Sequence, residues 1–123
     1  PINKKISAAN VFNYIPTFVA TNSTEALTNT STAVSVSTAI STVDSSGGAV
    51  TVTLAAGVTG QLKTIICTTA GNNITVTPAA TVGSGTTVVL DAAGESVQLL
   101  YTGTAWAAVA TSSFATNIAT VIQ

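Results

Sequence analysis

The side chains that could do acid–base or metal chemistry in this chain are few and scattered. Histidine, the usual general base and a common metal ligand, is absent. Of the four carboxylates, only Asp91 and Glu95 lie close together, flanking an Ala-Ala-Gly turn. They could hold a hard cation with backbone carbonyls, but aspartate at the start of a turn commonly bonds local amides. We favour a structural role, with Asp91 bonding the turn and Glu95 keeping an edge soluble, and expect no catalytic centre, metal or cofactor.

One cysteine and one aromatic pair are the remaining candidates for chemistry or recognition. Cys67 is the only cysteine, which excludes an intrachain disulfide and a cysteine-based metal cluster, so we interpret it as a small buried hydrophobe. Tyr101 and Trp106 face each other across an expected hairpin and form the one plausible stacking pair for a glycan. Because both lie among aliphatic residues, packing in the core or at a subunit interface is the favoured interpretation. An enzyme is the least expected class.

Composition indicates a single β domain that works through contact. The 123 residues fit one domain, and charged residues make up 6% of them, against roughly 25% in an average globular chain. Threonine and serine supply the polarity instead, and β-branched residues suit strands. Three basic and four acidic side chains cannot build the positive field that binds a phosphate backbone, so no nucleic-acid partner is expected. A surface so poor in charge favours burial by neighbours in an assembly.

Short alternating runs predict strands from residue 49 onward. Val50, Val52 and Leu54 alternate with threonine, while Leu62 to Cys67 is apolar on both faces, which is typical of a central strand. Val34 to Ile40 alternates into a candidate first strand. Three hairpins are expected, joining residues 62–67 to 73–77, 86–90 to 96–101, and 96–101 to 105–110. The pattern predicts an all-β fold, an antiparallel β-sandwich or barrel.

The two ends of the chain depart from this pattern. Residues 1–30 are expected to form an extended N-terminal arm and linker, residues 31–111 the β domain, and residues 112–123 a C-terminal tail. Residues 22–32 are rich in serine, threonine and asparagine, which is linker-like chemistry. The tail residues Phe114, Ile118, Val121 and Ile122 have helical spacing, so a short helix and a further strand are alternatives there. The candidate partner-binding residues of the arm are Ile2, Lys4, Lys5, Ile6, Phe12, Tyr14 and Phe18.

Targeting signals are not evident in the sequence. No apolar run approaches the roughly 18 residues of a membrane span, and the N-terminus lacks the pattern of a signal peptide. Pro1 is the residue that removal of an initiator methionine would leave. We therefore expect synthesis in the cytoplasm, without export and without a membrane partner.

Four stretches resemble the β modules of tailed-phage virion proteins. They are Gly60 to Ile66, Asn73 to Pro78, Leu90 to Val97 and Leu100 to Trp106. Such modules occur in head decoration or cement proteins, head fibres and tail fibres, and the order of the elements carries the resemblance more than any single motif. The resemblance implies a jelly-roll-like or related sandwich domain, commonly trimeric, that docks on a particle. It implies no catalytic residues.

From this resemblance and from the small size of the chain, we expect a virion structural protein, made in the host cytoplasm, that decorates the capsid surface. Its expected partners are the major capsid protein and two further copies of itself in a homotrimer. The arm is expected to lie along the capsid, where it could add a strand to an exposed sheet edge. The alternatives are a fibre or receptor-binding module, a carbohydrate-binding module, and a bacterial surface-layer or adhesin repeat, which would normally need an export signal.

Overall fold

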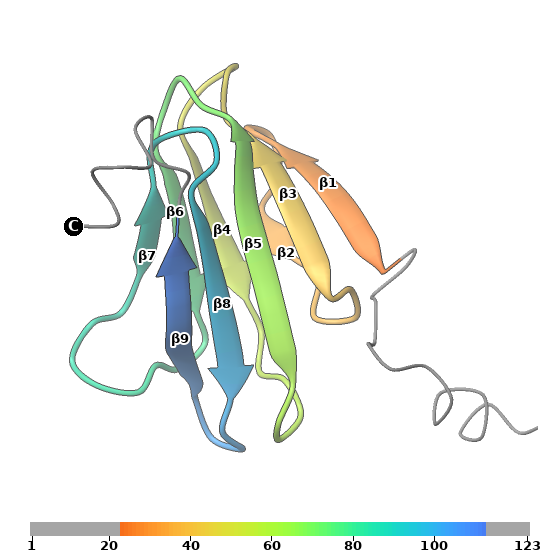
Figure 1. The fold of residues 1–123 in the computed structure, drawn as a ribbon, viewed down its shortest axis with the longest axis vertical. Helices are drawn as coiled ribbons and strands as arrows, with labels where there is room; N and C mark the ends of the chain where they lie inside the picture. The colour runs from red at the N-terminus through yellow and green to blue at the C-terminus, as the bar shows by residue number, and fades with distance from the viewer. Residues whose placement is uncertain (1–22, 113–123) are drawn as a thin grey trace, which may run out of the picture.

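The computed structural model describes residues 23–112, which form two β-sheets and contain no helix (Figure 1). The five-stranded sheet has the order β1 (Thr24–Thr28), β3 (Ile40–Asp44), β5 (Leu62–Thr69), β8 (Ser96–Tyr101) and β9 (Trp106–Ser112). The four-stranded sheet has the order β2 (Ala33–Val34), β4 (Val50–Leu54), β6 (Ile74–Pro78) and β7 (Val88–Leu90). The expected all-β class is confirmed. Among these residues no helix has the length and hydropathy that a membrane span requires.

The first six strands wind as three coils, each of which adds one strand to each sheet. Odd-numbered strands lie in one sheet and even-numbered strands in the other, so β1, β3 and β5 pair in parallel, as do β2, β4 and β6. The last three strands close the structure with antiparallel pairs, β6 with β7, β5 with β8 and β8 with β9. The expectation of an antiparallel sheet is therefore wrong for the four pairs made by the coils, and the sheets are mixed.

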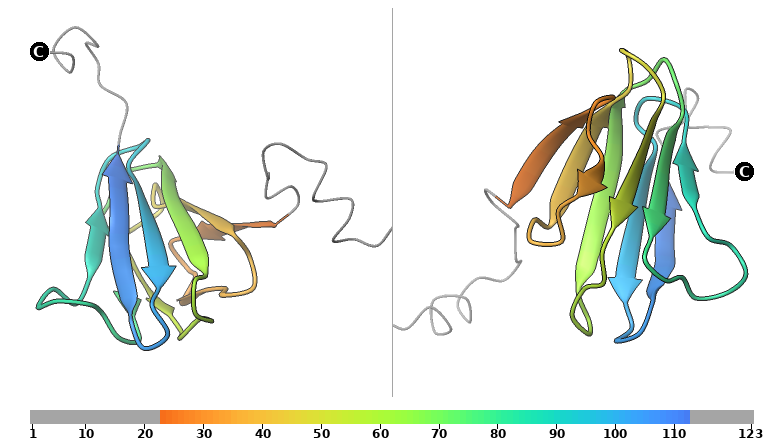
Figure 2. Two further views of the ribbon diagram at one scale, coloured as in Figure 1. Left: turned by 60° about the horizontal axis from the view of Figure 1, so that its bottom comes forward. Right: turned by 180° about the vertical axis from the view of Figure 1, so that it is seen from behind.

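Two of the three expected hairpins are also wrong, for the same reason. β5 and β6 lie in different sheets, and so do β7 and β8, so the turns that follow β5 and β7 cross between the sheets (Figure 2). A strand alternates inward and outward residues in the same way whichever sheet it joins, so periodicity alone cannot separate a hairpin from a crossover. The third hairpin, β8 with β9, is confirmed, and Tyr101 pairs with Trp106 in it.

The N-terminal boundary of the sheets also differs from the prediction. β1 lies within the segment interpreted as a linker, because its backbone pairs with β3 from Thr24 to Thr28 and its Leu27 packs against the core. The run from Val34 to Ile40 is not one strand either. It contains the end of β2, a loop over residues 35–39, and the start of β3, since the chain changes sheet there.

Inward side chains from both sheets form one hydrophobic core. Val50, Val52 and Leu54 of β4 are buried while the threonines between them are exposed, which confirms the predicted inward face. β5 lies at the centre of its sheet, as predicted, and its Cys67 is fully buried. The other buried hydrophobic residues are Val34, Val43, Ile65, Ile74, Val76, Leu90, Val97, Leu99, Tyr101 and Trp106.

The strand directions place the loops at two opposite ends of the molecule. The lower end in Figure 1 contains residues 35–39, 55–61, 79–87 and 102–105, and the upper end contains residues 29–32, 45–49, 70–73 and 91–95. β1 begins at the lower end, so the 22 residues before Ser23 join the described body there.

Candidate functional site

The two ends of the molecule differ sharply in charge. Three of the four carboxylates of the chain, Asp44, Asp91 and Glu95, lie at the upper end. None of the four lower-end loops contains a charged residue. The fourth carboxylate, Glu25, and the one lysine in the described range, Lys63, point inward between the sheets. Within residues 23–112, the loops are therefore acidic at one end and uncharged at the other.

The acidic end is a set of turns closed by their own side chains. Glu95 Oε1 accepts hydrogen bonds from the backbone N–H groups of Asp91 (2.6 Å) and Ala92 (2.9 Å), and these bonds lower the pKa of Glu95. The role expected of Asp91 is filled by Glu95, because it is Glu95 that bonds the turn amides. Among residues 23–112 no three His, Cys, Asp or Glu side chains lie close enough together to hold a metal ion.

The same carboxylates affect the thiol beneath them. Burial raises the pKa of Cys67, and the nearby carboxylates of Glu95, Asp44 and Asp91 raise it further. Hydrogen bonds from Ser46 lower the pKa of Asp44, whose Oδ1 accepts the Ser46 backbone N–H at 2.9 Å. These shifts favour carboxylates that stay ionised at the upper end and a thiol that stays protonated, so Cys67 behaves as the hydrophobe that was expected.

Trp106 fastens two long loops of the lower end. Its indole N–H donates to the carbonyl of Ala55 (2.9 Å), which begins the loop after β4. Its backbone N–H donates to Ala80, and its carbonyl accepts the N–H of Val82, both at 2.9 Å, which ties down the loop after β6. Gly57 lies directly against the ring, since a Cβ at Gly57 would come within 2.9 Å of Trp106 Cζ2.

Tyr101 completes the aromatic pair that the sequence singled out. The two rings meet edge to face, with centroids 5.1 Å apart and an interplanar angle of 67°, a favourable geometry for aromatic rings. Tyr101 is 8% exposed and Trp106 is 2% exposed. The structure thus places both rings in the core, where they pack against each other.

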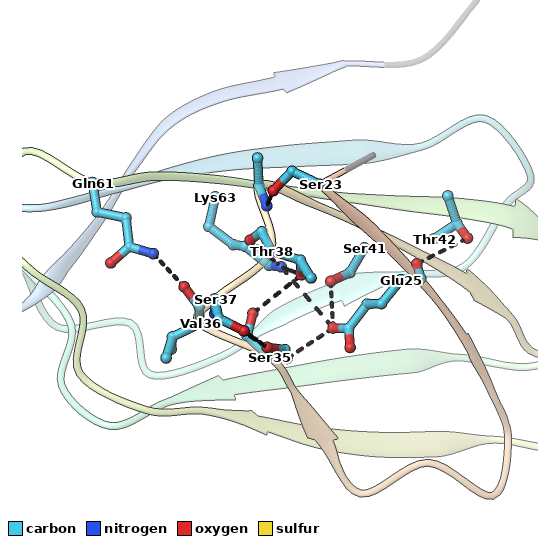
Figure 3. Close-up of polar contacts among 11 residues, drawn as sticks. Ser23, Glu25, Ser35, Val36, Ser37, Thr38, Ser41, Thr42, Gln61 and Lys63 are labelled. Carbon is cyan, nitrogen blue, oxygen red and sulfur yellow. Dashed lines mark hydrogen bonds and ion pairs between the residues drawn. The ribbon is translucent and has the colours of Figure 1, made fainter. Parts of the chain in front are cut away.

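A second group of inward side chains fastens the loop over residues 35–39 (Figure 3). Lys63 is fully buried, with 0% exposure, and its Nζ donates to the carbonyl (2.8 Å) and the Oγ1 (2.7 Å) of Thr38. Glu25 Oε1 accepts the backbone N–H of Ser35 at 2.7 Å and the hydroxyl of Ser41 at 2.6 Å. Strands β1 and β5 therefore hold the loop from its two sides.

Lys63 and Glu25 also interact as a long ion pair. Lys63 Nζ lies 4.0 Å from Glu25 Oε1, which is too far for a hydrogen bond. The closest contacts of the ammonium group are therefore to Thr38, and Glu25 acts on it through the attraction between opposite charges. Burial lowers the pKa of Lys63 to about 8, and the negative charge of Glu25 opposes part of this effect. Hydrogen bonds hold the lysine inside the protein, but the loss of water there raises the free energy of its charged form relative to its neutral form.

Gln61 connects the loop fastened by Lys63 to one of the loops fastened by Trp106. Its Oε1 accepts the backbone N–H of Val58 (3.0 Å), and its Nε2 donates to the carbonyl of Val36 (2.5 Å). One side chain thus links the loop over residues 55–61 to the loop over residues 35–39. Gly60 donates to the carbonyl of Tyr101 at 2.8 Å, which joins the aromatic group as well.

The lower-end loops, which these hydrogen bonds hold in place, expose aliphatic side chains. Val58 is 72% exposed, Val82 is 58% exposed, and Leu62, the first residue of β5, is 49% exposed. A pocket of about 160 Å³ opens beside Val82, with Val88, Leu99 and Trp106 among its lining residues. The lower end can make apolar contacts, and it has no surface group for ionic recognition within the described loops.

The candidate functional residues seen in the structure differ from those predicted from the sequence. The expected arm residues Ile2, Lys4, Lys5, Ile6, Phe12, Tyr14 and Phe18 lie outside the described residues, as does the tail from residue 113. Sequence reasoning missed the polar group formed by the fully buried Lys63 and the half-buried Glu25 and Gln61. The signal for Lys63 was present, because it shares the inward face of β5 with Ile65 and Cys67.

The chain matches no family model, and no curated protein matches its sequence.

Proposed function

We propose that this protein is a non-enzymatic structural component of a tailed-phage virion, a decoration protein that binds the outer surface of the head and stabilises capsomer junctions. Its partners in this proposal are the major capsid protein and two further copies of the chain in a homotrimer. The assembled shell is stabilised because the protein binds it and not its dissociated subunits.

The observation that carries the proposal is the internal placement of the only lysine in the described range. With Lys63 inside, residues 23–112 present no positive charge at their surface, whereas binding to a phosphate backbone depends on surface lysine and arginine. What this surface offers a partner is exposed aliphatic and hydroxyl groups on a body whose loops are tied down. Such a surface is suited to contact with another protein surface.

We further propose a specific description of the fold, in which the two sheets form a β-sandwich related to the jelly-roll-like modules of virion proteins. The shared core supports this proposal, since buried residues of both sheets belong to one cluster. The parallel coils of β1 to β6 distinguish it from a purely antiparallel jelly roll.

Electron cryomicroscopy of virions that contain the chain tests the function. We expect density for the two-sheet body on the outside of the head, with three copies around each threefold or quasi-threefold position. Density on the tail or on a fibre would instead support a fibre or receptor-binding module. A chain that is absent from purified virions would refute both, and light scattering of the free protein measures whether it is a trimer.

A further inference from the structure

We infer that the lower end is the surface that docks on the particle, so that the acidic upper end points away from it. This inference rests on the proposed function and adds an orientation and a contact chemistry. The occupant is an exposed aliphatic or aromatic side chain, together with its uncharged surroundings, on the outer surface of the protein shell.

Charge distribution supports this orientation. The lower-end loops contain no charged residue, whereas Asp44, Asp91 and Glu95 lie at the opposite end. Docking through the upper end would remove carboxylates from water, and unpaired buried charge is costly. Docking through the lower end leaves every surface carboxylate hydrated and needs no complementary positive charge on the partner.

Rigidity supports it as well. Trp106 and Gln61 make hydrogen bonds to the loops that carry Val58 and Val82. Lys63 makes hydrogen bonds to the loop over residues 35–39. A surface that is already ordered loses little conformational freedom on binding, so more of the contact energy appears as affinity.

The pocket beside Val82 identifies the kind of side chain that the partner supplies. Its volume is about 160 Å³, and Val82, Val88, Leu99 and Trp106 contribute apolar lining. An apolar cavity of about 150 Å³ holds one benzene ring, so this pocket fits a single large apolar side chain. Interface energy tends to concentrate at such anchors, which occupy pockets near the centre of the contact.

The chain connection points the same way. The 22 residues before Ser23 enter the body at the lower end, because β1 begins there and runs toward the upper end. Any contact that those residues make with the shell is therefore continuous with the lower-end loops. A body docked by its upper end would place this connection on the far side.

The test measures co-sedimentation of the full chain with purified virion heads from which it has been removed. The variants Val58→Asp and Val82→Asp add a charge to the lower end, and Ala108→Leu narrows the pocket, which Ala108 lines, without changing charge. The matched control is Val89→Asp, because Val89 is 50% exposed but lies in β7 on the outer face of the four-stranded sheet, outside the lower-end loops. We expect at least a tenfold weaker Kd for each lower-end variant and an unchanged Kd for the control.

The outcomes separate this inference from the function on which it rests. If the wild-type chain does not bind heads at all, the proposed function fails. If it binds and Val58→Asp and Val82→Asp bind equally well, or if only Val89→Asp loses binding, the docking surface is wrong although the function stands. If the lower-end variants instead turn an oligomer into a monomer in light scattering, the lower end joins copies of this chain, which also overturns the inference. Thermal melting confirms that each variant is folded.

Discussion

The two ends of this molecule are built by the same strands but held together in different ways. At the upper end, short polar side chains link one turn to the next: Ser45 Oγ donates to the carbonyl of Asn72 at 2.7 Å, and Asn72 Nδ2 donates back to the carbonyl of Ser45 at 3.0 Å. At the lower end, long side chains reach outward from the core to the loops, as Trp106 and Lys63 do. The upper end is acidic, and the lower end is uncharged.

This difference has a physical basis. At the upper end, short polar side chains bond within their own turn, as Glu95 does, or to the adjacent turn, as Ser45 does, so this end can carry charge in water without long side chains from the core. The lower-end loops are longer, and local bonds alone would leave their backbone groups unpaired. Anchoring them to buried side chains orders these loops without placing charge on their surface. The lower end therefore depends on the core more strongly than the upper end does.

Removal of the Trp106 side chain should break this arrangement most severely. We expect Trp106→Ala to lower the free energy of unfolding by about 3–5 kcal/mol, because it leaves a large cavity. The carbonyl of Ala55 also loses its indole donor. Denaturant unfolding measures the stability, and hydrogen exchange locates the loss. Protection should fall first in residues 55–61 and 79–87, with the upper-end turns less affected.

Trp106→Phe is the control for this prediction, because it keeps most of the apolar volume and removes the indole N–H. A carbonyl left without its donor costs about 1–3 kcal/mol, so this variant should lie between the wild type and Trp106→Ala. Uniform loss of protection at both ends in either variant would show that Trp106 acts only as core volume and does not fasten the lower end in particular.

Lys63 gives the lower end a dependence on pH. Its pKa is lowered from 10.5 to about 8 in the folded chain by burial. Between these values the unfolded chain binds the extra proton, so the free energy of unfolding should rise as pH rises from about 8 to about 10.5. The full difference corresponds to about 3 kcal/mol. Urea unfolding at several pH values in this window measures it.

The variant Lys63→Met isolates the contribution of the lysine. It removes the titrating group while keeping a long unbranched side chain, so the rise with pH should disappear relative to the wild type. Ionisation of Cys67 acts in the opposite direction above pH 9, since its pKa is raised in the folded chain, but it does so in both proteins and cancels in the difference. An equal pH dependence in the two proteins would mean that Lys63 is solvated in solution.

Much of the strand pattern could be predicted from the sequence, because burial on one face imposes a period of two. The inward residues of β4 and the β8–β9 hairpin follow from alternation and turn residues, and the central position of β5 was predicted from apolar residues on both of its faces. The end of β6 at Pro78 also follows, since proline cannot donate to the ladder. These features depend on residues that are neighbours along the chain.

The pairing between coils could not be predicted in the same way. A parallel partner lies many residues away, and nothing in the local alternation of β3 indicates whether its neighbours are β1 and β5 or β2 and β4. The polar group of the lower end was missed for a related reason. Glu25 lies in a segment whose composition resembles a linker, and its meeting with Lys63 depends on the position of β1 beside β3.

The smallest difference between the ends should appear in the stability changes caused by alanine at two glycines, Gly57 and Gly71. Neither glycine has a left-handed backbone angle, so alanine can adopt both conformations. A Cβ at Gly57, in the lower end, would lie 2.5 Å from Gln61 Oε1 and 2.9 Å from Trp106 Cζ2, in a ring that the core holds in place. A Cβ at Gly71, in the upper end, would meet nothing closer than 3.4 Å. We expect Gly57→Ala to destabilise the protein by about 1–3 kcal/mol through overpacking. Gly71→Ala should be neutral or stabilise it by about 0.4–1 kcal/mol, because alanine restricts the unfolded chain. Thermal unfolding of the two variants compares them directly, and equal stability changes would show that the Trp106 ring yields, so that the lower end is no more tightly packed than the upper.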